Sequence, residues 1–169
     1  MILIVAGVAG SGKSTVGKLL AETLGWPFAD ADSFHPEANI AKMRAGIPLT
    51  DADREPWLRA VGSWIDDEIA GGHSGVITCS ALKRAYRDRL LAGRPAARMI
   101  LLQVDRDELV RRLTSRQGHF LHEELLESQL EAFEPPTPDE HVRLVSEEGG
   151  PAKTVARIIA LLWPEGKTA

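Results

Sequence analysis

The segment Gly7–Ser14 has the clearest chemical signature in the sequence. It reads Gly-Val-Ala-Gly-Ser-Gly-Lys-Ser and matches the pattern G-x-x-x-x-G-K-[ST] in full. Its glycines, Gly7, Gly10 and Gly12, allow the backbone N–H groups to turn inward around phosphate oxygens without a clash of Cβ atoms. An apolar run precedes the segment and an amphipathic stretch follows it, so we expect a strand, a loop and a helix N-terminus that favours anions.

Two side chains of this motif predict nucleotide chemistry. Lys13 would reach the β- and γ-phosphates, and the Ser14 hydroxyl would bind Mg²⁺. The alternative is a glycine-rich turn of purely structural use. GTPases carry Asp-x-x-Gly and Asn-Lys-x-Asp, and neither string occurs in this chain. An ATPase would require an acidic residue at the end of an apolar strand, and none ends the apolar run at 76–79. With GTPases and ATPases disfavoured, the remaining class of P-loop protein is a kinase for a small molecule.

Two acidic residues, Asp30 and Asp32, follow the second predicted strand. In an extended chain, residues i and i+2 point the same way, so both carboxylates should share one face. At the carboxyl edge of a parallel sheet that face overlooks the ligand. One carboxylate can support Mg²⁺ while the other orients the attacking hydroxyl and accepts its proton. The alternative is simple turn formation, for which aspartate is well suited.

Basic residues supply a complement for an anionic acceptor. The range 83–98 contains six basic residues and one acidic residue, in a chain that is acidic overall. Lys83 and Arg87 are spaced i, i+4, so a helix that begins near Ser80 would place both on one side. Arg54, at a predicted loop-to-helix junction, could hold a carboxylate through two hydrogen bonds. For the other arginines a solvated basic face is an equal alternative.

Arg112 and Arg116 are four residues apart at the end of a predicted helix and precede Gly118. Such a segment could close over the phosphates as a lid, where arginine stabilises the charge of the transferring phosphoryl group. His119 and His122 have a spacing that could bind metal. They have no cysteine or third ligand beside them, which disfavours a metal site.

Short apolar runs alternate with amphipathic stretches along the chain. Strands are predicted at 2–6, 27–29, 76–79, 99–104 and 141–145, and helices at 13–24, 54–70, 106–117, 123–134 and 152–163. This alternation predicts an α/β fold of three layers around a parallel sheet. The stretch 35–50 interrupts the alternation and is expected to form a small insertion, helical at 36–45.

Composition limits the class of protein. A chain of 169 residues with 44% hydrophobic and 26% charged residues is typical of one globular domain. The net charge of −4 argues against a nucleic-acid partner, and the absence of a long apolar run argues against a membrane. The single cysteine, Cys79, cannot form an internal disulfide, so we expect a reducing, cytoplasmic setting.

Taken together, these residues resemble the gluconokinase family of small P-loop kinases, which is related in fold to shikimate and nucleoside monophosphate kinases. The segments that carry the resemblance are Gly7–Thr15, Asp30–Asp32, His35-Pro36, Asn39–Met43, Gly46–Leu49, Asp51–Leu58, Cys79–Lys83, Tyr86–Asp88, Arg116–Phe120, Gln129 and Phe133–Pro135. The resemblance implies one P-loop kinase domain over 1–169, with a five-stranded parallel sheet in the order 2-3-1-4-5. It also implies a substrate-binding insertion at about 35–52 and a lid at about 116–124.

The implied reaction is ATP-dependent phosphorylation of D-gluconate on its 6-hydroxyl, which gives 6-phospho-D-gluconate and ADP. The resemblance assigns the ATP phosphates and Mg²⁺ to Gly10, Ser11, Gly12, Lys13, Ser14 and Thr15, and the nucleotide and lid to Arg112 and Arg116. The motif adds Gly7 to the ATP site, and Asp30 is the candidate metal ligand beside Ser14, although the sequence does not decide which of Asp30 and Asp32 serves the metal and which the base. The resemblance assigns catalysis to Lys13, Asp32 as the base, and Arg116. Candidates for binding the acceptor are Asp32, His35, Arg54, Lys83, Arg87 and His119.

Several alternatives stay open at this point. The acceptor could be another small anion, such as shikimate or a nucleoside monophosphate. The chain could also be a catalytically silent nucleotide sensor, although the retention of Lys13, Ser14, Asp32 and Arg116 disfavours this alternative. Members of the family are often homodimers, and the sequence does not decide the oligomeric state. No motif defines the residues that contact adenine.

Overall fold

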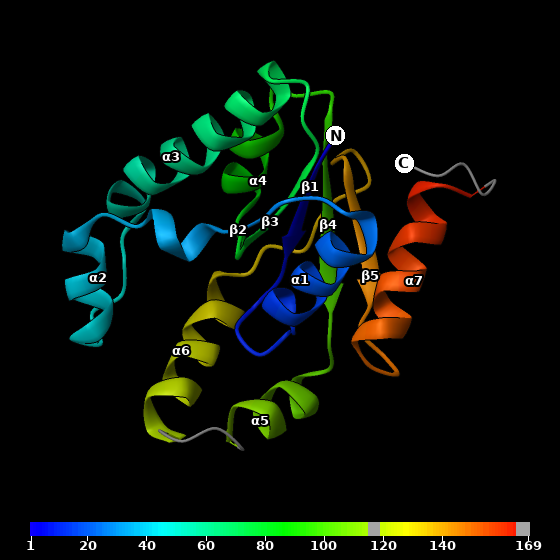
Figure 1. Ribbon diagram of the computed structural model, residues 1–169. Helices are drawn as coiled ribbons and strands as arrows, with labels where there is room; N and C mark the ends of the chain where they lie inside the picture. Colours follow the sequence, from blue (N-terminus) through cyan, green and yellow to red (C-terminus); the bar gives the residue numbers. More distant parts are fainter. Residues whose placement is uncertain (115–118, 165–169) are drawn as a thin grey trace.

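The centre of the molecule is a parallel sheet of five strands. The computed structural model describes residues 1–114 and 119–164, with side chains described for 1–113 and 126–164. The strands are β1 (Ile2–Ala6), β2 (Phe28–Asp30), β3 (Gly75–Cys79), β4 (Ala97–Gln103) and β5 (Val142–Ser146). They pair in the order β2-β3-β1-β4-β5, which confirms the predicted topology (Figure 1).

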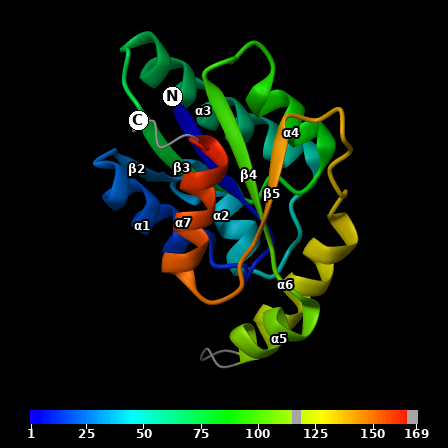
Figure 2. The ribbon, with the colours of Figure 1, turned by 90° about the vertical axis from the view of Figure 1, so that its right-hand side faces the viewer.

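Helices cover both faces of the sheet, so that the fold has three layers. The covering helices are α1 (Lys13–Leu24), α3 (Asp51–Ala70), α4 (Arg84–Leu91) and α7 (Pro151–Leu162). Alternate residues of the fully buried strand β1 belong to opposite layers. Ile2 and Ile4 pack with α3 and α4, whereas Leu3 and Val5 pack with α1 and α7. Figure 2 shows α7 and α1 on one side of the sheet and α3 and α4 on the other.

Two further helices lie at the carboxyl edge of the sheet, α5 (Arg106–Thr114) and α6 (His119–Ala132) (Figure 1). They share a third apolar cluster with the loops that follow β1 and β3. Its buried members are Val8, Leu82, Leu109, Leu113 and Leu126. This cluster fixes both helices beside the glycine-rich loop.

The expected insertion is present and helical. Its helical part is α2 (Glu37–Arg44), close to the predicted 36–45, and a short 3-10 helix, η1 (Ala31–Phe34), precedes it. The helix predicted at 54–70 begins earlier, at Asp51, because Thr50 and Asp53 form a capping box. The Thr50 hydroxyl accepts a bond from the Asp53 N–H, 3.2 Å, and the Asp53 carboxylate accepts one from the Thr50 N–H, 3.0 Å.

Cys79 closes β3 and is 2% exposed. Burial raises the pKa of its thiol to about 12, so the neutral form dominates at physiological pH. No helix among residues 1–114 and 119–164 combines the length and apolar character that crossing a membrane requires.

Candidate active site

Several polar segments, most of them with predicted chemistry, begin where a strand ends. The glycine-rich loop follows β1, η1 follows β2, Lys83 lies in the loop after β3, α5 follows β4, and Glu147 directly follows β5. Because all five strands are parallel, these segments meet at one edge of the sheet. Ligands bind at that edge in open α/β sheets.

The glycine-rich loop has a backbone that other residues would not adopt. Gly12, at the N-cap of α1, has φ of 88° in the left-handed region, where a side chain costs energy. At Gly7 a Cβ atom would lie 2.6 Å from the Ser11 hydroxyl, closer than real Cβ contacts come. The motif glycines therefore shape the loop itself, as predicted for a phosphate cradle.

The loop leaves hydrogen-bond donors for a ligand. No side chain caps the N-terminus of α1. The buried Ser11 hydroxyl has no hydrogen-bond partner within the described part of the protein. Unsatisfied donors at a helix N-terminus favour an anion, so these residues fit the phosphates of a nucleotide. Ser14 and Thr15 are exposed in the first turn of the same helix.

Lys13 folds back across the loop. Its Nζ donates to the Val8 carbonyl oxygen, 2.9 Å, and the Ser11 N–H donates to the same oxygen, 3.2 Å. The ammonium group thus lies against the loop that it is predicted to serve. The N–H of Ala9 donates to Oε1 of Gln129 on α6, 2.6 Å, a contact that sequence reasoning missed.

Arg112 reaches the rim of this loop from α5. Its guanidinium pairs with Glu108, 2.6 Å, and with Glu147, and its Nη1 lies 3.5 Å from the carbonyl oxygen of Gly10. This position agrees with a role beside the nucleotide. Glu147 is buried and was missed, because the only signal was its position directly after an apolar strand.

The two aspartates after β2 do not share one extended face, and this expectation is wrong. The chain leaves the strand at Asp30 and turns at once into η1. The Asp30 carboxylate caps that turn by accepting a bond from the Asp32 N–H, 3.1 Å. The Asp32 side chain is exposed, whereas Asp30 is half-buried. The two carboxylates therefore have different surroundings.

His35 ties the insertion to α3. Its ring stacks on Trp57 with centroids 4.6 Å apart, and its Nδ1 lies 3.3 Å from the amide nitrogen of Asn39. Because the amide can only donate, Nδ1 accepts and the proton of the neutral ring is on Nε2. Burial lowers the pKa of His35; Asp32 opposes this shift and Arg54 adds to it.

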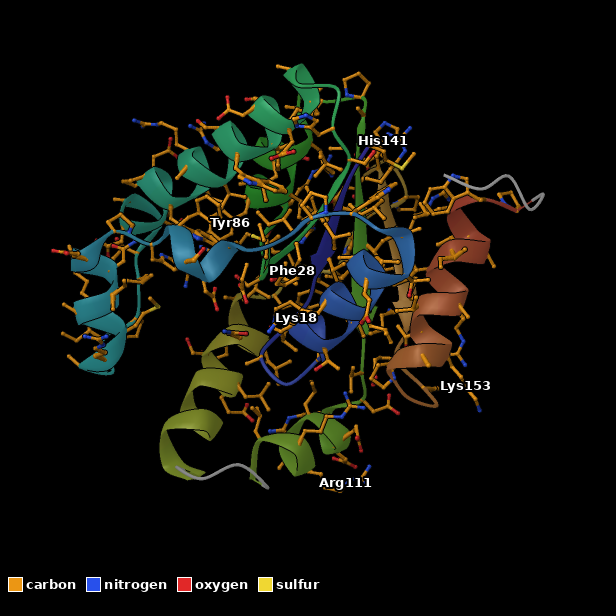
Figure 3. All side chains as sticks on the ribbon, viewed as in Figure 1. Lys18, Phe28, Tyr86, Arg111, His141 and Lys153 are labelled. Carbon is orange, nitrogen blue, oxygen red and sulfur yellow. The ribbon has the colours of Figure 1, made fainter. Side chains whose placement is uncertain are left out.

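The predicted acceptor cations Lys83 and Arg54 meet at one aromatic ring. Lys83 Nζ is 5.6 Å and Arg54 Cζ is 5.9 Å from the centroid of Tyr86, which lies beside α3 in Figure 3. Lys83 also pairs with Asp51, 2.8 Å, and the Tyr86 hydroxyl donates to the same carboxylate oxygen, 2.5 Å. These bonds lower the pKa of Asp51 and raise that of Lys83. Together, Arg54, Asp51, Lys83 and Tyr86 form a small polar cluster, which we call the Tyr86 cluster.

The Arg87 side chain is buried and paired within the protein, so its predicted contact with an acceptor needs correction. Lys83 is the N-cap of α4, outside the helix, and the Arg87 side chain is fully buried. Its guanidinium forms two bonds with Glu140, 2.6 and 3.0 Å, and donates to the carbonyl oxygens of Leu82 and Glu134. Arg87 therefore holds the chain together at this edge.

The prediction for Arg116 lies outside the described residues, as does the part of the predicted lid at 116–118. The rest of the predicted lid, 119–124, forms the first turns of α6, and the side chains there, including that of His119, lie outside the described ones. Arg111 precedes this region, on α5, and Figure 3 shows its side chain at the outer side of that helix.

Comparison with known proteins shows that the chain is related to small-molecule kinases. The sequence matches the shikimate kinase family over residues 9–162. It is 45% identical to the gluconokinase of Gluconobacter oxydans over 93% of this chain and 88% of that one. Among solved structures, a sugar kinase from Janibacter sp. superposes with a TM-score of 0.87 at 42% identity, covering 95% of this chain and 93% of that one. A gluconokinase from Sinorhizobium meliloti gives 0.80 at 39% identity, covering 98% and 97%.

Proposed function

The chain belongs to the gluconokinase family of P-loop kinases, and from that membership we propose its reaction: ATP-dependent phosphorylation of D-gluconate on the 6-hydroxyl, giving 6-phospho-D-gluconate and ADP. The family resemblance inferred from the sequence is thereby confirmed. The observation that carries the acceptor assignment is the Tyr86 cluster. Two cations flank one aromatic ring at the same edge of the sheet as the phosphate loop.

The glycine-rich loop and the first turn of α1 form the proposed ATP site. Bound ATP would supply the phosphoryl group, and Mg²⁺ would neutralise its charge. Backbone N–H groups from Gly10 to Thr15 would hold the phosphates, with Ser14 at the metal. Lys13 would keep its bond to the Val8 carbonyl oxygen and direct its other N–H groups to the phosphate oxygens. Arg112 would contact the nucleotide from α5.

Asp32 is the proposed base. Its carboxylate is exposed, so it can accept a proton from the 6-hydroxyl and direct that oxygen toward the phosphoryl group. Asp30 keeps η1 in place through its cap and is proposed to support the metal with its remaining lone pairs. His35, whose Nε2–H is a donor, is proposed to bind a hydroxyl of the acceptor.

Lys83 and Arg54 are proposed to bind the carboxylate of gluconate. In the structure Lys83 is paired with the exposed carboxylate of Asp51, which has the charge and shape of the group expected from the acceptor. We expect gluconate to take the place of Asp51 at the ammonium group. Arginine and lysine both form stronger hydrogen bonds to a carboxylate than neutral donors do.

The remaining assignments belong to the same proposal. Residues 35–52 would form the acceptor-binding insertion, and 116–124 a lid that carries Arg116 and His119. The whole chain would act as one kinase domain in the cytoplasm.

An assay of ADP release against a panel of acceptors tests the reaction. The panel contains D-gluconate, its C4 epimer D-galactonate, shikimate and AMP. We expect turnover with gluconate, and ³¹P NMR of the product should show a phosphate ester on the primary hydroxyl. Faster turnover with shikimate or AMP would replace the proposed acceptor. No turnover with any acceptor, while ATP still binds, would favour a nucleotide sensor.

A further inference from the structure

One peptide unit of the phosphate loop is held from both sides. The Val8 carbonyl and the Ala9 N–H belong to the same planar peptide and point in opposite directions. The carbonyl oxygen accepts from Lys13 Nζ and from the Ser11 N–H. The N–H donates to Gln129 Oε1 at 2.6 Å. The orientation of this single plane therefore decides where one hydrogen-bond partner of Lys13, the Val8 carbonyl oxygen, lies.

Gln129 comes from a part of the chain distant in sequence, 120 residues after Ala9. It lies on α6, whose Leu126 is fully buried in the cluster that contains Val8, and whose Leu130 packs against the same cluster together with Ala9. Packing on either side of position 129 thus fixes the helix against the loop. The glutamine adds a directed polar contact to an otherwise apolar junction.

The side chain at position 129 must supply a hydrogen-bond acceptor to make this contact. A backbone N–H donates, so the side chain must present its carbonyl oxygen and not its amide nitrogen. An apolar residue of the same size would keep the packing but leave a half-buried N–H without this acceptor. The peptide plane could then rotate, and the Val8 carbonyl oxygen would turn away from Lys13.

We infer that Gln129 is a positioning residue for the P-loop lysine. By fixing the Val8–Ala9 peptide, it keeps the loop in the shape that receives phosphates and keeps Lys13 beside it. Gln129 lies on α6, outside the glycine-rich motif, so the motif alone does not indicate this role. The inference rests on the proposed function only to the extent that the loop binds the phosphates of ATP.

The test compares Gln129→Met, which keeps the length of the side chain but removes the acceptor, with Ser128→Ala on the exposed neighbouring position. Calorimetry measures the Kd of Mg·ATP without any acceptor present. A neutral hydrogen bond corresponds to roughly 2- to 13-fold in an equilibrium constant, so we expect Kd to rise about 3- to 10-fold in Gln129→Met. Ser128→Ala should leave Kd unchanged.

A double-mutant cycle separates positioning from general damage. If Gln129 acts through Lys13, adding Gln129→Met to Lys13→Met should change Kd by less than about twofold. The inference would be overturned if Gln129→Met raised Kd by the same factor in the native chain and in Lys13→Met, or if it left the Kd of the native chain unchanged. Because binding is measured without gluconate, this result does not depend on which acceptor the enzyme uses.

Hydrogen exchange of the Ala9 amide gives a second readout in the nucleotide-free protein. We expect protection in the native chain and in Gln129→Glu, which keeps an acceptor oxygen, and faster exchange by about fivefold or more in Gln129→Met. Rapid exchange in the native chain or in Gln129→Glu would also overturn the inference. The Gln129→Glu variant keeps the test decisive if the methionine variant does not fold.

Discussion

At the scale of single residues, the two aspartates after β2 differ in the hydrogen bonds and the solvent exposure of their carboxylates. Asp30 accepts a bond from the backbone of η1, whereas Asp32 is exposed. Asp32→Asn keeps the size of the side chain but cannot accept a proton. We expect kcat to fall by about 10²- to 10⁴-fold, the usual contribution of a positioned base. The Kd of Mg·ATP, measured by calorimetry, should change by less than about tenfold.

Asp30→Asn is the matched comparison. An asparagine can still cap η1, so the fold should persist. If Asp30 supports the metal, activity should fall and recover in part at high Mg²⁺ concentration. Normal turnover of Asp32→Asn together with an inactive Asp30→Asn would reverse the two assignments.

Lys13 is expected to be indispensable for turnover. Its ammonium group donates to the Val8 carbonyl oxygen of its own loop. Lys13→Ala removes a positive charge from the phosphates. We expect turnover to fall by at least ~10³-fold, the scale of losing one charge-stabilising donor. Steady-state assays and a urea titration should show lost activity with the free energy of unfolding nearly unchanged, and a near-native kcat would contradict the kinase assignment.

The Tyr86 cluster should serve the acceptor and not ATP. Replacing Arg54 or Lys83 by alanine removes a charge-assisted hydrogen bond, worth ~1.5–3 kcal/mol. The KM for gluconate should therefore rise roughly 10- to 150-fold, with the KM for ATP nearly unchanged. Asp51→Asn is the control, since it frees Lys83 from its partner and should not raise the KM for gluconate. An equal rise for both substrates would indicate damage to the fold instead.

At the scale of elements, periodicity predicts the sheet well and the polar contacts poorly. The strand β1 has the bounds that the sequence predicts, because a short, fully buried apolar run has few alternatives. Sequence reasoning misplaces Arg87 because its partner Glu140 lies 53 residues away, and no local spacing indicates such a pair. It misplaces Asp32 because a 3-10 turn capped by Asp30 has no periodicity of its own. Local patterns predict elements, whereas contacts between distant segments need the fold.

The Arg87–Glu140 pair makes a prediction about stability. Both side chains are almost fully buried, so removing the cation alone leaves a buried carboxylate without the charge that it pairs with, although it keeps its bonds from Thr137. We expect Arg87→Met to lower the free energy of unfolding by about 3–5 kcal/mol, measured by urea titration. Arg87→Met with Glu140→Leu should recover much of that loss. A single variant as stable as the native protein would contradict a structural role for Arg87.

The same pair predicts a reversal of pH dependence. Hydrogen bonds from Arg87 lower the pKa of Glu140 below its ordinary value of 4.5. The pair therefore contributes stability that is present above pH 4.5 and is lost as the pH falls through the lowered pKa. In Arg87→Met the buried carboxyl should have a raised pKa, so stability should increase as the pH falls from about 7 toward about 5. Urea titrations of both proteins at several pH values check the opposite signs.

At the scale of the whole molecule, the two proposed substrate sites lie on segments that connect distant parts of the chain. The phosphate loop follows β1 and contacts α6, while the Tyr86 cluster joins α3 to the loop after β3. Binding to the folded state should therefore stabilise the entire domain. A non-hydrolysable Mg·ATP analogue at about 100 times its Kd adds about 2.7 kcal/mol, which for this size raises Tm by roughly 5–11 °C. Calorimetric scans should show this shift, and its absence would contradict a nucleotide site in this loop.

The burial of Cys79 makes the native chain a convenient background for fluorescence spectroscopy. The only thiol of the sequence is buried at the last residue of β3. Its pKa of about 12 leaves almost no thiolate to react with a maleimide. A cysteine introduced at the exposed Met43 of α2 would then be labelled alone, with no need to remove the native one. A second one at the exposed Ser128 of α6 would complete a donor–acceptor pair. Energy transfer between the two dyes could then report, in real time, how far the insertion moves relative to α6 when each substrate binds.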